Sequence, residues 1–142
     1  MVHTEPASRI DSHAQRLLLV DSFPDESDLY SEFLAHCGFR VQTSDRTDDA
    51  LAAALAEPPD VVVTRLRQSA GQLDGIQFTS RLRCVRRTRD VPVVLITTSI
   101  LPSDYEAARE AGCNRVVVLP ATPDELLVEV QSAITGNRRA SP

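Results

Sequence analysis

Short apolar runs alternate with segments of helical periodicity along most of the chain. The apolar runs are five to seven residues long and contain few polar positions. Uninterrupted runs of this length are typical of β-strands that other elements cover on both faces. The five predicted strands are residues 16–21, 39–43, 60–66, 92–97 and 115–119.

Start and stop signals place a helix after each predicted strand. Gly38 ends the first helix, and Pro58-Pro59 ends the second. The predicted helices are residues 24–36, 45–56, 74–85, 103–111 and one from residue 123 onwards. Three of them open on capping signals, namely Asp74-Gly75, the capping box Ser103-x-x-Glu106, and Thr122-Pro123-Asp124-Glu125. The expected apolar faces are Leu29, Phe33 and Cys37 in the first helix, and Leu126, Val130, Ala133 and Ile134 in the last.

Strict alternation of strands and helices predicts an α/β fold with a parallel sheet, because each strand is joined to the next by a helical crossover. We expect a flavodoxin-like (βα)5 three-layer sandwich with a five-stranded sheet of order 2-1-3-4-5. In that order the functional crevice lies outside the carboxyl ends of strands one and three. The rule selects the residues at these strand ends and their neighbours, which are Asp21, Ser22, Arg65, Thr97, Thr98, Leu119 and Pro120.

The composition is that of one globular domain. The chain has 142 residues, 42% hydrophobic and 25% charged. We expect a disordered leader over residues 1–15, a domain over 16–135 and a disordered tail over 136–142. A net charge of -5 argues against general binding to nucleic acid or to an anionic membrane. With no apolar run of membrane-spanning length and no secretory signal, the expected location is the cytoplasm.

Side-chain chemistry excludes several classes of site. Cys37, Cys84 and Cys113 have no metal-site spacing, so we expect free thiols that are buried or half-buried. All fifteen basic residues are arginines, which excludes any mechanism that needs a lysine amine. An arginine cluster within residues 81–89 is interpreted as the solvated end of a helix, because it has no interleaved aromatic residues for binding nucleic acid.

Five segments, in order and spacing, resemble a response-regulator receiver domain of the CheY-like superfamily over residues 16–135. The segments are LLLVDSFPDES, PDVVVTRL, LDGIQFTSRLR, PVVLITT and AGCNRVVVLPATPDEL. In that family two adjacent acids, an acceptor aspartate and a backbone carbonyl hold Mg²⁺. A Thr or Ser and a Lys bind the phosphoryl oxygens, since a carboxylate that attacks a phosphoryl group needs its charge neutralised.

The resemblance also shows what this chain lacks. Asp21 matches the first acid and Thr97 the hydroxyl, whereas Ser22 replaces the second acid, Arg65 the acceptor and Leu119 the lysine. The loop from Arg65 to residue 74 is two residues longer than the common spacing. We therefore expect a degenerate pseudo-receiver that is not an enzyme, has lost Mg²⁺ binding and has no other cofactor.

Each of these positions also has a purely structural interpretation. Arg65 is expected to be a structural cation that pairs with Asp21, because buried charges need partners. Ser22 is expected to be a helix N-cap facing Asp25. Thr97 is expected to satisfy backbone groups, and Leu119 to pack as an apolar pocket floor.

Three functional hypotheses follow. The first is a phosphorylation-independent signalling or scaffolding module that contacts a protein partner or its own effector domain. Its contact face would be helices four and five and strand five, which active relatives use for homodimers. The second is a receiver that accepts phosphate at a displaced carboxylate, with Asp74 and Asp60 nearest in sequence. The third is a small-anion sensor that uses Arg65 and Thr97.

Overall fold

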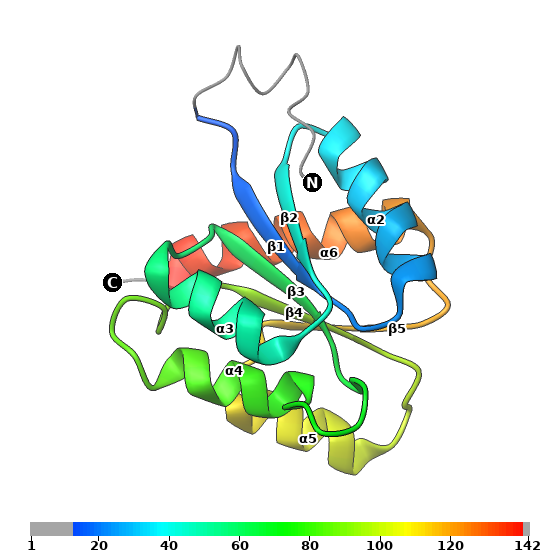
Figure 1. The fold of residues 1–142 in the computed structure, drawn as a ribbon, viewed down its shortest axis with the longest axis vertical. Coiled ribbons are helices and arrows are strands. Elements are labelled where there is room, and N and C mark those ends of the chain that lie inside the picture. Colours follow the sequence, from blue (N-terminus) through cyan, green and yellow to red (C-terminus); the bar gives the residue numbers. More distant parts are fainter. Residues whose placement is uncertain (1–12, 141–142) are drawn as a thin grey trace.

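The computed structural model describes residues 13–140, with side chains to residue 136. Five strands form one parallel sheet (Figure 1). The strands are β1 (Arg16–Val20), β2 (Arg40–Ser44), β3 (Val61–Arg65), β4 (Val93–Thr97) and β5 (Arg115–Val118). The helices are α2 (Pro24–His36), α3 (Thr47–Ala56), α4 (Gly75–Arg83), α5 (Pro102–Ala111) and α6 (Pro123–Ala140).

The strand order is β2-β1-β3-β4-β5, and every neighbouring pair is parallel. Helices α2 and α6 cover one face of the sheet, and α3, α4 and α5 cover the other (Figure 1). The sequence-based prediction of a flavodoxin-like α/β fold with order 2-1-3-4-5 is therefore confirmed.

The central strands are apolar on both faces because each face is covered by helices. Leu17 and Leu19 of β1 pack into the cluster that contains α2 and α6 residues, and Leu18 and Val20 pack into the cluster with α3 and α4. Successive side chains alternate between faces, so a continuous apolar run fills both cores. Strands β2 and β5 are the edges of the sheet.

Two sequence predictions about helices are wrong in detail. In α2 the buried apolar side chains are Tyr30 and Leu34, while Leu29 is 55% exposed, so the predicted face is displaced by one residue. Helix α5 has Leu101 as its N-cap and Pro102 in its first turn, which leaves Ser103 inside the helix rather than capping it. Proline fits the first helical position because its missing N–H has no partner there.

The last helix opens as predicted and continues further than predicted. Thr122 Oγ1 accepts a hydrogen bond from Glu125 N, and Glu125 Oε1 accepts one from Thr122 N, which completes a capping box. Helix α6 includes residues 136–140, which the sequence analysis assigns to a frayed tail. Residues 1–12 of the leader predicted at 1–15, and the final residues 141–142, lie outside the described residues. Within residues 13–140, no helix has the length and apolar character needed to cross a membrane.

Candidate functional site

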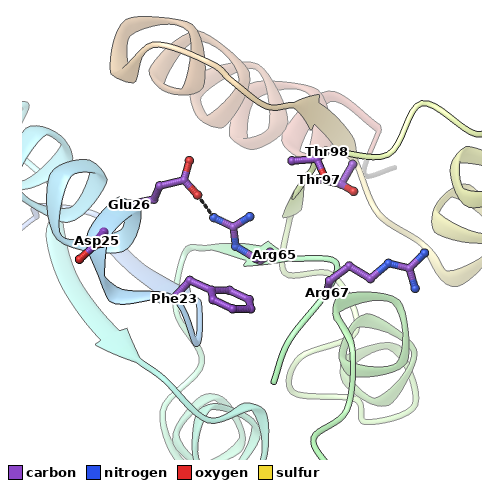
Figure 2. A pocket seen from close by; sticks show the side chains of 7 residues that line it. All are labelled: Phe23, Asp25, Glu26, Arg65, Arg67, Thr97 and Thr98. Carbon is purple, nitrogen blue, oxygen red and sulfur yellow. Dashed lines mark hydrogen bonds and ion pairs between the residues drawn. The ribbon is translucent and has the colours of Figure 1, made fainter. Parts of the chain in front are cut away.

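The carboxyl ends of the central strands meet at one edge of the sheet, as parallel strands must. Asp21 follows β1, Arg65 ends β3 and Thr97 ends β4. A pocket of about 490 Å³ opens there (Figure 2). It is lined by Phe23, Asp25, Glu26, Arg65, Arg67, Thr97 and Thr98. The structure thus brings three of the five predicted site residues together at this edge.

Arg65 holds two carboxylates at the floor of the pocket. Its Nε donates to Asp21 Oδ1 at 2.9 Å, which is the ion pair that the sequence predicts. Its Nη2 donates to Glu26 Oε1, a second ion pair drawn as a dashed line in Figure 2. Sequence reasoning missed Glu26. The available signal was its place in the first turn of the helix that follows the first strand.

Two of the charges at this site are buried, whereas the Glu26 side chain is 46% exposed. The Asp21 side chain is fully buried, and that of Arg65 is 10% exposed. Burial alone lowers the pKa of Arg65, but hydrogen bonds and charge from Asp21 and Glu26 outweigh it and raise that pKa above its ordinary value. The guanidinium carbon also lies 5.3 Å from the centre of the Phe23 ring, within range of a cation-π interaction. Arg65 is therefore firmly charged and held on three sides.

One oxygen of Asp21 remains unused. Asp21 Oδ1 accepts hydrogen bonds from Arg65 Nε and from Phe23 N at 2.9 Å. Oδ2 is buried and has no hydrogen-bond partner among the described residues. In residues 13–140 no group of three His, Cys, Asp or Glu side chains is placed to hold a metal ion.

Ser22 does not cap the helix as predicted. The N-cap of α2 is Phe23. Ser22 instead binds the long loop after β3, since its N donates to Gln68 Oε1 at 2.9 Å and its Oγ accepts from Ser69 N at 2.9 Å. Gln68 Nε2 also donates to Arg65 O at 2.9 Å. The loop is thereby fixed over the turn that follows β1.

Thr97 satisfies backbone groups, as predicted from the sequence. Its Oγ1 accepts from Ser99 N at 3.0 Å. The Ser99 hydroxyl bonds to Asp104, whose Oδ2 lies 3.6 Å from Arg67 Nη2. This chain of contacts joins the loops after β3 and β4 to the start of α5.

Leu119 is 6% exposed and belongs to the core cluster that contains α2 and α6 side chains. It therefore packs, as predicted, but it does not line the pocket.

The two carboxylates named as possible displaced phosphate acceptors, Asp74 and Asp60, form hydrogen bonds elsewhere. Asp74 Oδ1 accepts from Gln77 N at 2.8 Å and caps α4. Asp60 Oδ2 accepts from Arg16 N at 2.8 Å, at the amino edge of the sheet.

Comparisons with known proteins agree on one family. A family model described as the response regulator receiver domain matches residues 17–131. PilH of Pseudomonas aeruginosa is 27% identical over 121 residues, which are 85% of this chain and 98% of PilH. The transcriptional regulatory protein BaeR of Escherichia coli is 26% identical over 133 residues, which are 94% of this chain and 52% of BaeR. The chain thus spans about half the length of BaeR.

A solved structure has the same fold. It is the receiver domain of the sensor histidine kinase PA1611 from Pseudomonas aeruginosa, with a magnesium ion coordinated in its active site cleft. The TM-score is 0.77 at 27% sequence identity, and the match covers 86% of this chain and 98% of that chain.

Proposed function

This chain belongs to the response regulator receiver domain family of two-component signalling, and we propose that its signalling does not depend on phosphorylation. The observation that carries the proposal is the guanidinium of Arg65, which occupies the space between Asp21 and Glu26 at the end of β3. A guanidinium is no nucleophile toward a phosphoryl group, and its positive charge offsets part of the negative charge of the two carboxylates around it.

We further propose that the site does not take up Mg²⁺. The PA1611 receiver domain holds magnesium in its cleft. Here the carboxylates of Asp21 and Glu26 are both bonded to Arg65, and the free Asp21 Oδ2 is a single buried oxygen. Magnesium needs octahedral oxygen coordination, and a fixed cation between the carboxylates repels it. The residues present do not fit the ion.

Incubation with acetyl phosphate and Mg²⁺, followed by intact-mass measurement, tests the proposal. We expect no phosphoryl adduct, whereas a receiver domain with an intact acceptor aspartate, run in parallel, gains one. A stable adduct on any aspartate of this chain would overturn the proposal. The displaced-carboxylate alternative predicts an adduct that is lost in Asp74→Asn.

The output of such a domain would come from protein contacts. Around α5, β5 and α6 the structure exposes large apolar side chains, of which Leu101 is 56%, Tyr105 40% and Val128 56% exposed. Exposed apolar side chains on a domain surface favour protein partners. We propose that this face binds a cytoplasmic protein partner, an effector domain or a second copy in a homodimer. Light scattering on the protein and on Val128→Asp tests the homodimer, which we expect the charged residue to weaken.

A small-anion sensor is a second candidate, favoured by the pocket beside Arg65. Arg67 and Thr98 add donors to the wall of this pocket (Figure 2). Thermal shift against a panel of anionic metabolites tests it, because a ligand present at about 100 times its dissociation constant stabilises a protein by about 2.7 kcal/mol. No shift with any member of the panel would remove this candidate.

A further inference from the structure

An arginine-rich turn lies at the edge of the sheet opposite the pocket. Five of the fifteen arginines fall within residues 81–89. Helix α4 starts just after the carboxyl end of β3 and ends at Arg83, so the turn that follows lies at the amino edge of the sheet (Figure 1). Four of the five side chains are exposed, and we call them the arginine turn: Arg81, Arg86, Arg87 and Arg89.

The fifth arginine, Arg83, donates hydrogen bonds to neighbouring groups of the fold. Arg83 Nη1 donates to Val91 O at 2.7 Å, and its Nη2 donates to Gly112 O at 2.8 Å and to Asn114 Oδ1 at 3.1 Å. Burial lowers the pKa of this guanidinium. Arg83 therefore ties the end of α4 to the end of α5, and only the other four arginines are available to a partner.

The arginine turn projects from a fixed base. The Thr88 side chain is buried, and its hydroxyl donates to Leu82 O at 2.7 Å. Arg87 Nη2 donates to Ala56 O at 3.2 Å, which attaches the turn to the end of α3. The preference of basic residues for helix ends explains Arg81, in the last turn of α4, but Arg86 and Arg89 lie beyond the helix.

Exposed carboxylates gather at the opposite edge. The first turns of α2, α3, α5 and α6 all carry acids. Helix α3 connects the two edges, because it begins beside three aspartates and ends at Ala56, where Arg87 binds. Its ten residues span about 15 Å at 1.5 Å per residue. We call these aspartates the acidic start of α3: Asp45, Asp48 and Asp49.

We propose that copies of this chain associate head to tail, with the arginine turn of one copy against the acidic start of α3 of the next. Among the side chains of residues 13–136, no ion-pair partner is found for Arg81, Arg86 or Arg89, while the whole chain carries a net charge of -5. The two surfaces have opposite charge and lie at opposite ends of one helical layer. Such a contact is heterologous, so it builds a ring if the rotation between copies closes and an open filament if it does not. It is independent of phosphorylation and separate from the face around α5, β5 and α6.

Sedimentation velocity at two salt concentrations tests the proposal. At about 0.01 M salt the Debye length is about 30 Å and at about 1 M it is about 3 Å, so exposed ion pairs act only at the lower concentration. We expect the sedimentation coefficient to rise with protein concentration at low salt and to stay at the monomer value at high salt. A monomer under both conditions, or a dimer that salt does not affect, would overturn the proposal.

Charge-reversal variants locate the contact. We expect Arg86→Glu/Arg89→Glu to be monomeric at low salt. The control Arg67→Glu/Arg109→Glu has the same net charge, -5 - 4 = -9, but its changed residues lie outside both surfaces, so it should still associate. Association that survives in the first variant, or that is lost equally in both, would contradict the contact.

A mixing experiment then tests complementarity. Asp45→Arg/Asp49→Arg keeps the arginine turn, and Arg86→Glu/Arg89→Glu keeps the acidic start of α3. Each alone should be monomeric, because like charges then face each other. An equimolar mixture should associate again, because both contacts between the two variants pair opposite charges. Circular dichroism confirms that each variant folds. A short double-stranded DNA is added at low salt as a probe. If it binds the arginine turn while the protein itself stays monomeric, the arginine turn is a polyanion-binding surface and self-association is refuted.

Discussion

At position 65 a single side chain forms ion pairs with two acids. Arg65 reaches Asp21 through Nε and Glu26 through Nη2, so it spans from the end of β3 to the first turn of α2. A divalent cation would neutralise the same carboxylates only while it is bound. The guanidinium of Arg65 is covalently part of the chain and is always present. The folded chain itself therefore supplies this positive charge.

Removing the Arg65 side chain should cost about 3 to 5 kcal/mol, the range found when one partner of a buried ion pair is deleted. The cost arises because Asp21, whose side chain is fully buried, would be left charged and unpaired. Urea unfolding of Arg65→Ala measures it. Arg67→Ala is the matched control, since its ion pair is 68% exposed on the arginine side and should contribute less than about 1 kcal/mol.

A double variant separates charge from packing. If the cost comes from the unpaired carboxylate, Arg65→Ala/Asp21→Asn should be more stable than Arg65→Ala alone. A double variant with the summed cost of both single changes would show that the two side chains do not interact, contrary to the 2.9 Å contact.

At the scale of elements, α2 is held at its first turn and at its middle. Arg65 holds its first turn, and Tyr30 in its middle donates to Ala121 O at 2.8 Å, just before α6. Burial first, and then the charge of Glu26, raise the pKa of Tyr30. The phenol must therefore stay protonated for α2 to keep this contact.

The raised pKa of Tyr30 predicts a loss of stability in alkali. Its contribution is complete below the unfolded pKa of about 10, and it falls as the pH rises toward the folded value, because the unfolded chain releases the proton first. Tyr30→Phe should cost about 1 kcal/mol near neutral pH through the lost hydrogen bond. Above about pH 10 the difference between the two proteins should shrink. Urea unfolding at several pH values measures this, and a constant difference would contradict it.

The loop after β3 is held by Gln68, whose amide joins three backbone groups. It accepts from Ser22 N and donates to Val20 O and Arg65 O. Gln68→Ala should leave these groups to water and raise hydrogen exchange in residues 66–74. Gln131→Ala, at an exposed position of α6, is the control and should leave that exchange unchanged. Equal exchange in both variants would mean that the loop is held by its other contacts.

The sequence predicts the elements well because periodicity and caps are local signals. All five strands, the capping box at Thr122 and the Arg65 to Asp21 pair follow from such signals and from the ends of parallel strands. The exposed Leu29, the loop contact of Ser22 and the second ion pair to Glu26 do not. Each depends on which neighbour a side chain meets across the fold, and no local pattern specifies that.

At the scale of the whole molecule, the parallel fold places strand ends together whatever residues occupy them. The two cores are made almost entirely of residues other than those that differ from the family pattern. Only Leu119 belongs to both groups, since it is a core side chain in the place of the lysine. The frame of a receiver therefore does not depend on which side chains stand at its strand ends.

Because the fold does not depend on the residues at the strand ends, these residues can be exchanged to test phosphoryl acceptance and Mg²⁺ binding. Arg65→Asp alone should gain no phosphoryl group from acetyl phosphate, because Ser22 and Leu119 leave the added negative charge uncompensated. The triple variant Arg65→Asp/Ser22→Asp/Leu119→Lys supplies the missing acids and the cation. We expect Mg²⁺ to raise the melting temperature of the triple variant and not that of the natural chain, measured by thermal shift with Ca²⁺-free buffers.

A phosphoryl adduct on the single variant would show that Ser22 and Leu119 do not prevent phosphoryl transfer. A triple variant that folds but ignores Mg²⁺ would place the remaining defect in the longer loop, which Gln68 fixes over the turn after β1.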